Sequence, residues 1–333
     1  MKVVRLVALA LAGMMSVAIV AVAAPADKPT QVTFQLNTVP SPSDHAYFEV
    51  GIEKGFYKAE GLEVFLQLGT GSATTLRLVG SSNPPLGFVD VGTMILGVMR
   101  GIPVKSIAVV NQGSPMAVIF KKGKGYRSIR DLKGASIATT QAGSLTQMFP
   151  LVLRANGMTT DDVKLIYTGN PAAKEVAMLS GNTDAYLGFY TENGIRNQAA
   201  GHDVAWIKFS DAGVNIMNLA VVANAAWLKE NPAIARAFVR ATQKAIKYTV
   251  DNPREAAAIF FRKYSKDFTE EVILRMIQAS IPLLHTSTSR GLPYGATAEE
   301  DWRATEKLIT ELANLRPLAG VSLYYTNEFA TGK

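Results

Sequence analysis

Histidine is scarce in this chain, and one of its three histidines, His45, stands at the start of a predicted helix over residues 43–54. Imidazole can act as a base, a metal ligand or a hydrogen-bond partner. His202 and His285 lie in distant segments, and no nucleophile–base pattern or histidine–carboxylate metal spacing accompanies any of the three. The sequence therefore predicts no catalytic role, metal or cofactor, and leaves His45 either contacting a ligand or satisfied by nearby backbone.

A glycine-rich loop, Gly69-Thr70-Gly71-Ser72, follows one predicted strand and precedes a predicted helix. Backbone N–H groups and a hydroxyl in such a loop suit an anionic or carbonyl group of a ligand. The loop lacks the lysine of a phosphate-binding P-loop, which argues against nucleotide hydrolysis. Thr70, Gly71 and Ser72 are therefore predicted ligand contacts, with ordinary helix capping by Ser72 as the alternative.

Other candidates occupy similar places at the ends of predicted strands. Tyr190 offers a flat ring and a hydroxyl to an aromatic ligand, and Glu192 can accept hydrogen bonds from ring amino groups. The alternative for Glu192 is a place in the first turn of a helix, favoured by the helix dipole. The predicted ligand contacts beyond the glycine-rich loop and His45 are Asn37, Ser114, Ser144, Tyr190 and Glu192.

The elements that must position these residues alternate short apolar runs with helical patterns, an order that predicts parallel sheets with helices on their faces. Ser43 or Asp44 is expected to cap the first helix, and Gly55 to end it. The predicted strands cover residues 32–37, 62–68, 86–91, 135–140, 163–169 and 185–190, and the predicted helices cover 43–54, 73–79, 144–155, 173–180, 225–250, 253–264, 268–280 and 298–314.

The first half of this layout returns about one hundred residues later. At an offset of 101, Ser43 falls on Ser144, and Leu86-Gly87-Phe88 falls on Leu187-Gly188-Phe189. The repeat predicts an α/β fold with two doubly wound lobes, whose strand ends meet at a shared cleft where ligands of open sheets bind. A two-strand hinge, residues 115–123 and 217–224, would let the lobes close. Lobe one is predicted over 30–116 and 222–333, and lobe two over 117–221.

The N-terminus carries a pattern typical of a secretory signal peptide. Lys2 and Arg5 precede the apolar run LVALALAGMMSVAIVAVAA, which ends in small residues. We expect a signal peptide over residues 1–23, with cleavage as late as residue 26 as the alternative. A retained membrane anchor is the other interpretation. Because the chain has no cysteine, lipidation at an N-terminal cysteine and disulfides are excluded, and we expect a periplasmic protein that is not a lipoprotein.

Composition limits the classes of function. The apolar content of 48% is enough for one large or two ordinary α/β domains. The formal net charge is +7, but no arginine-rich stripe or basic–aromatic patch accompanies it, so nucleic acid is not an expected partner.

Several stretches together resemble a known family. They are LNTVPSPSDHAYFEVGIEKGFYKAEGLEV, GIPVKSIAVV, DLKGASIATTQAGS, YTENGI and LYYTNEF. The chain resembles, over about residues 30–330, the exported solute-binding proteins of the NMT1/THI5-like family, which include receptors for thiamine pyrimidine precursors and alkanesulfonates. The resemblance implies a type II periplasmic-binding-protein fold, delivery of a solute to a membrane permease of an ABC transporter, and ligand-facing positions for His45, Tyr190 and Glu192.

The resemblance leaves the ligand open. Members nearest to the pyrimidine binders carry a tryptophan in the first loop, where this chain has Thr38, and the eukaryotic enzymes of the family use a cysteine-rich motif that this chain lacks. Because no arginine lies in the loops assigned to the cleft, we expect a neutral or amino-bearing aromatic heterocycle, such as a pyrimidine precursor. The alternatives are alkanesulfonates, nitrate-like anions or aromatic carboxylates. We expect a monomeric transport receptor, with an exported enzyme or a sensory binding protein as the alternatives of other classes.

Overall fold

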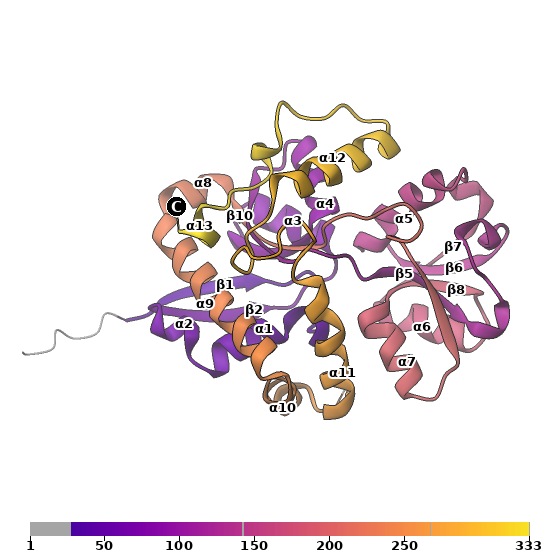
Figure 1. The fold of residues 1–333 in the computed structure, drawn as a ribbon, viewed down its shortest axis with the longest axis horizontal. Helices are drawn as coiled ribbons and strands as arrows, with labels where there is room; N and C mark the ends of the chain where they lie inside the picture. Colours follow the sequence, from indigo (N-terminus) through magenta and orange to yellow (C-terminus); the bar gives the residue numbers. More distant parts are fainter. Residues whose placement is uncertain (1–27, 142, 267, 333) are drawn as a thin grey trace, which may run out of the picture.

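The computed structural model describes residues 28–141, 143–266 and 268–332, and the predicted signal peptide lies outside these ranges. Two lobes lie side by side, each built around one five-stranded sheet (Figure 1). Among the described residues, no helix has the length and hydropathy needed to cross a membrane.

Sheet one lies in lobe one and has the strand order β2-β1-β3-β10-β4. β1 runs parallel to β2 and β3, whereas β10 runs antiparallel to β3 and β4. The carboxyl ends of β1, β2 and β3 therefore lie at one edge, the edge at which open α/β sheets bind ligands. The strands are β1 (Thr30–Gln35), β2 (Leu62–Gln67), β3 (Leu86–Asp90), β4 (Val104–Asn111) and β10 (Leu219–Asn224).

Sheet two lies in lobe two and repeats this pattern with the order β7-β6-β8-β5-β9. β6 is parallel to β7 and β8, and β5 is antiparallel to β8 and β9. The predicted repeat of elements and the parallel pairing of the predicted strands are thus present. The sheets are mixed rather than parallel throughout, because each takes in an antiparallel strand that comes directly from the crossing between the lobes. The strands are β5 (Met116–Lys121), β6 (Ser136–Thr140), β7 (Lys164–Thr168), β8 (Ala185–Phe189) and β9 (Val204–Lys208).

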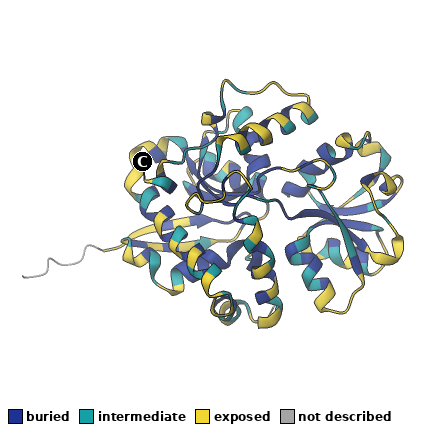
Figure 2. Ribbon diagram, viewed as in Figure 1, coloured by how far each residue is buried: buried dark blue, intermediate teal, exposed yellow. Residues whose placement is uncertain are grey.

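The helices cover both faces of the sheets and expose their outer sides, while the strands at the centre of each lobe are buried (Figure 2). Lobe one contains α1 (Pro42–Glu53), α2 (Phe56–Ala59), α3 (Ser72–Gly80), α4 (Val91–Met99), α8 (Ala225–Glu230), α9 (Pro232–Asp251), α10 (Pro253–Tyr264), α11 (Glu270–Ser280), α12 (Glu299–Ala313) and α13 (Glu328–Thr331). Lobe two contains α5 (Ser144–Ala155), α6 (Pro171–Leu179), the π-helical turn η4 (Tyr190–Gly194) and α7 (Ile195–Ala199).

Helix α1 begins earlier than predicted. Its first residue is Pro42 and its N-cap is Ser41, so Ser43 and Asp44 lie inside the first turn rather than capping it. Proline suits the first helical position because its fixed φ matches the helix, and because an N–H group at this position would have no hydrogen-bond partner within the helix. Gly55 follows the C-cap with φ of 70°, which confirms its predicted place at the end of the helix.

The chain crosses between the lobes twice, and the crossings lie next to each other at the start of β10 and the end of β4. The return crossing ends earlier than predicted, because Leu219 already pairs with Asp90 and Asn111 of sheet one. Lobe one therefore resumes by residue 219 rather than 222.

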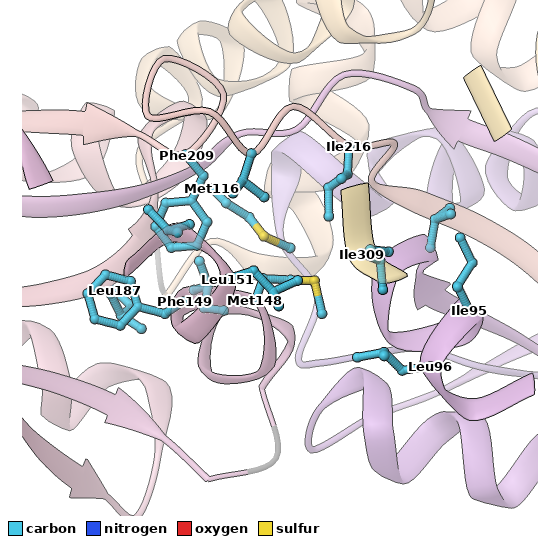
Figure 3. Close-up of a cluster of buried hydrophobic side chains, with 14 of the residues drawn as sticks. Ile95, Leu96, Met116, Met148, Phe149, Leu151, Leu187, Phe209, Ile216 and Ile309 are labelled. Atoms are coloured by element: carbon cyan, nitrogen blue, oxygen red, sulfur yellow. The ribbon is translucent and has the colours of Figure 1, made fainter. Parts of the chain in front are cut away.

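One hydrophobic cluster continues across the junction of the lobes. Met148 and Phe149 of α5 lie between Leu187 of lobe two and Ile95 and Ile309 of lobe one (Figure 3). Helix α5 contacts α4 and α12, and α7 contacts α11. The lobes are thus packed together in this structure.

Candidate functional site

His45 lies in the interior of lobe one, fully buried. Its Nδ1 accepts a hydrogen bond from the Ser41 N–H at 2.9 Å, and its Nε2 donates to Oδ1 of Asn37 at 2.9 Å. Burial lowers the pKa of His45 to about 3, so the ring is neutral at physiological pH. Both ring nitrogens have protein partners, and we infer that His45 holds the loop between β1 and α1 in place rather than contacting a ligand.

The glycine-rich loop after β2 is tied to the same Asn37. The Gly71 N–H donates to the Asn37 carbonyl at 2.7 Å, and a Cβ at Gly69 would lie only 2.0 Å from the carbonyl oxygen of Leu36. Glycine is therefore required where the two loops meet. Gly71, not Ser72, is the N-cap of α3, and the side chain of Thr70 is exposed.

Ser72 faces inward rather than outward. It is buried, and its Oγ accepts a hydrogen bond from the Asp90 N–H at 3.1 Å. The capping alternative for Ser72 was wrong, because the helix begins at this residue. The loop holds the ends of β1, β2 and β3 together at the edge of sheet one.

The lobes meet through a polar contact close to His45. The hydroxyl of Ser41 donates to Oε2 of Glu192, the predicted ligand contact in η4 of lobe two. Ser41 and Ser43 are also within hydrogen-bond distance of each other, at 3.1 Å between their Oγ atoms. Sequence reasoning missed Ser41, because only its place in the fold brings it to Glu192.

Asp44 adds a second carboxyl group to this junction. It is fully buried, and burial together with the nearby charge of Glu192 raises its pKa to about 8, although a hydrogen bond from Ser43 lowers it. Nδ2 of Asn111 donates to Oδ1 of Asp44 at 3.2 Å. Asp44 had been predicted only as a helix cap, and its burial could not be read from local sequence.

Basic groups of lobe two surround Glu192. Nη1 of Arg196, one turn further along, lies 3.3 Å from Oε1 of Glu192, and Arg196 also forms an ion pair with Glu175. Lys174 is buried beside them, and burial lowers its pKa to about 8. No arginine was expected in the loops assigned to the cleft, and Arg196 comes from helix α7 instead, where two carboxylate partners neutralise it.

The other predicted residues lie outside this network. The ring of Tyr190 stacks on Trp206 with centroids 6.1 Å apart, and Nζ of Lys208 lies 5.0 Å from its centroid. Oγ of Ser114 accepts from the Met116 N–H at 3.4 Å, and Ser144 is the buried first residue of α5. The structure therefore joins Asn37, His45 and Glu192 through Ser41, holds the glycine-rich loop against Asn37, and leaves Ser114, Ser144 and Tyr190 apart from them.

The chemistry available at this junction is hydrogen bonding to carboxylates, hydroxyls and amides. Among the described residues, no three histidine, aspartate or glutamate side chains are grouped so that they could hold a metal ion. His45 has no free nitrogen with which to accept a proton from a substrate. These groups can hold a polar molecule through hydrogen bonds.

Comparison with known proteins gives matches over most of the chain. A sequence model of the family described as NMT1/THI5 like matches residues 42–256. The riboflavin-binding protein RibY of Chloroflexus aurantiacus is 24% identical and covers 93% of this chain and 89% of its own length. The formylaminopyrimidine-binding protein of Halalkalibacterium halodurans is 25% identical over 78% of each chain.

Other matches carry different names. A 4-amino-5-hydroxymethyl-2-methylpyrimidine phosphate synthase of Uromyces fabae is 26% identical over 63% of this chain and 64% of its own. The alkanesulfonate-binding protein SsuA from Xanthomonas axonopodis pv. citri, solved with bound MOPS, superimposes with a TM-score of 0.67 at 11% identity, covering 90% of this chain and 99% of that one. At this identity the likeness shows a shared fold, which confirms the predicted periplasmic-binding-protein architecture.

Proposed function

Because this chain belongs to the NMT1/THI5-like family, we propose that it is an exported solute-binding receptor of an ABC importer. It captures a small organic molecule between its lobes in the periplasm and, as a monomer, presents the closed form to a membrane permease. The observation that carries this proposal is the junction at which Glu192 of lobe two meets Ser41 and Asp44 of lobe one.

The charge of the junction favours one class of ligand. Glu192 offers carboxylate oxygens to N–H donors and repels a sulfonate or nitrate, whereas Asp44, whose pKa burial raises to about 8, is mainly protonated near neutral pH and still offers a carboxyl oxygen as an acceptor. An amino-bearing aromatic heterocycle, such as a thiamine pyrimidine precursor, supplies such donors. The names of the riboflavin-binding and formylaminopyrimidine-binding relatives, both of which refer to heterocycles, support this choice.

Two alternatives have some support. Arg196 and Lys174 could meet an anion if their carboxylate neighbours moved aside, as a sulfonate or carboxylate receptor would require. An enzyme of pyrimidine synthesis is the other alternative, since a synthase is among the relatives. The chain has no cysteine, and the only histidine at the junction is buried with both nitrogens bonded, which argues against it.

The decisive experiment identifies the solute and tests for turnover. Purified protein is extracted with organic solvent, and the extract is analysed by mass spectrometry. The protein is then unfolded, refolded and titrated with the extracted compound, or with a panel of heterocycles where none is extracted. We expect saturable binding, compaction in X-ray scattering and no chemical change in the ligand. Conversion of the ligand by the wild-type protein would favour the enzyme, and binding without compaction would contradict closure.

A further inference from the structure

Three polar residues lie at the ends of three neighbouring strands of sheet one, at the edge where the chain crosses to lobe two. Asp90 is the last residue of β3, Asn111 is the last residue of β4, and Asn218 immediately precedes β10, which runs between them. Leu219 pairs with both Asp90 and Asn111, and the Asn218 N–H donates to the Asn111 carbonyl at 3.1 Å. We call these three residues, Asp90, Asn111 and Asn218, the strand-end cluster.

Each member of the cluster carries a buried polar atom without a partner among the described residues. These atoms are Oδ2 of Asp90, Oδ1 of Asn111 and Nδ2 of Asn218, and each residue is no more than 1% exposed. An unsatisfied buried polar group costs about 1–3 kcal/mol, and folded proteins bury few of them. Three at one sheet edge therefore need an explanation.

The structural roles of these residues use other atoms. Oδ1 of Asp90 accepts from the Thr93 N–H at 2.8 Å and so caps α4, whereas Nδ2 of Asn111 donates to Asp44 at 3.2 Å. The unpartnered atoms therefore make no hydrogen bond that stabilises the fold. They lie at the sheet edge where α/β lobes bind ligands, and Asn111 links them to Asp44 and the Glu192 contact.

We propose that the strand-end cluster is a subsite for a ligand edge that carries two N–H donors beside one acceptor. This proposal rests on the proposed receptor function. Oδ2 of Asp90 and Oδ1 of Asn111 are acceptors, and Nδ2 of Asn218 is a donor. An amino group next to a ring nitrogen has the complementary pattern.

Other ligand chemistries fit this subsite poorly. A sulfonate has acceptors only, and would face two acceptors of the cluster. The imide edge of a flavin presents one donor between two acceptors, the reverse of what the cluster requires. Burial raises the pKa of Asp90 to about 7, so at pH 8 its carboxyl group is mainly ionised and accepts hydrogen bonds.

The test uses a pair of pyrimidines that differ in one group. The probes are 4-amino-5-hydroxymethyl-2-methylpyrimidine and the same compound without its 4-amino group, each titrated calorimetrically into the protein at pH 8. A polar group left unpaired in the complex costs about 1–3 kcal/mol, so we expect wild-type protein to bind the amino compound roughly 5- to 150-fold more tightly.

Two variants test the cluster itself. Asn218→Leu removes the unpartnered donor, and Asp90→Asn replaces the unpartnered oxygen while its other oxygen can still cap α4. Both should lose at least about tenfold in affinity for the amino compound, without a lower melting temperature, because the removed atoms have no partner in the protein. A merely structural role would lower the melting temperature.

A matched control comes from the other end of β10. Asn224 has partners on both side-chain atoms, accepting from Ala226 and Trp227 N–H groups and donating to the Gly80 carbonyl. Asn224→Leu should lower the melting temperature and leave the affinity unchanged.

The outcomes separate this subsite from the receptor function. Equal affinity of wild-type protein for the two pyrimidines, or wild-type affinity in both cluster variants, overturns the subsite. Binding of riboflavin but of neither pyrimidine overturns the donor pattern and leaves the receptor function standing. If no solute in a panel of heterocycles, carboxylates and sulfonates binds, the receptor function itself is contradicted.

Discussion

Ser41 of lobe one donates its hydroxyl hydrogen bond to Glu192 of lobe two, although 151 residues separate them in the chain. The N–H of the same serine donates to His45, so the contact between the lobes is joined to the buried hydrogen bonds at the end of β1. The contact between the lobes and the shape of the first loop are therefore coupled through a single residue.

Glu192→Gln tests whether the charge at this contact binds the ligand. Glutamine can still accept from Ser41, so the lobes should close as before, but a charge-assisted hydrogen bond to the ligand becomes a neutral one. We expect affinity for the heterocycle to fall about tenfold in calorimetry. Glu255→Gln, at an exposed ion pair with Lys54, is the control and should bind normally. Equal affinities of the two variants would remove Glu192 from the site.

His45→Ala should act mainly on stability. The substitution removes two buried hydrogen bonds and leaves a cavity, so the free energy of unfolding in urea should fall by about 2–4 kcal/mol. His202→Ala, at an exposed position, should change it by less than about 0.5 kcal/mol. A His45→Ala protein of normal stability that fails to bind ligand would instead make His45 a direct contact.

Asp44 should make stability depend on pH. Its pKa is about 8 in the folded protein and close to 3.8 when unfolded, so the folded state holds a proton that the unfolded state has lost. The free energy of unfolding should therefore decrease as pH rises from 6.5 to 8, by up to about 1.4 kcal/mol per pH unit for this group. Below pH 6.5 the lowered pKa of His45 acts in the opposite direction, because the unfolded state then binds the extra proton.

Asp44→Asn should flatten that slope. Urea titrations at pH 6.5 and pH 8 are expected to show the variant more stable than wild type at pH 8, with a residual slope up to about pH 7 from Asp90, whose pKa is also raised. An unchanged slope in the variant would mean that Asp44 is ionised in the folded protein.

Gly92→Leu should hold the lobes apart. A Cβ on Gly92 of α4 would lie 2.6 Å from Sδ of Met148 in lobe two and 3.0 Å from Ile216 of the return crossing. We expect a larger radius of gyration in X-ray scattering and at least about tenfold weaker binding. Adding Met148→Ala should restore part of the compaction and part of the affinity. Gly123→Leu, in open space on lobe two, is the control. Wild-type compaction in Gly92→Leu would contradict closure by this packing.

Much of the fold could be predicted because its signals are local. Gly55 marks the end of α1 as predicted, and α5 and α10 were predicted with the bounds that the structure has. The antiparallel β5 and β10 could not be oriented from their sequences, since an apolar run is compatible with either direction and only the crossing between the lobes decides it.

The site was harder to predict than the fold. Glu192 could be named because it follows a strand, but Asp44, Ser41 and Asn218 carry no local signal. Their contacts are with residues far away in the chain; Asn111, for example, comes 67 positions after Asp44. The sequence left two roles open for His45, a ligand contact or a residue satisfied by its neighbours, and only the fold shows that both ring nitrogens have protein partners, Ser41 and Asn37.

The most direct test of a heterocycle receptor measures thermal stability with three classes of solute: aminopyrimidines, flavins and alkanesulfonates. Wild-type protein and Glu192→Lys are compared at a solute concentration near 100 times the dissociation constant, where binding adds about 2.7 kcal/mol and should raise the melting temperature by about 5 °C. We predict that a heterocycle stabilises the wild-type protein and not the variant. Stabilisation by sulfonates alone, equal stabilisation of both proteins, or none by any class would contradict a heterocycle receptor that closes at Ser41 and Glu192.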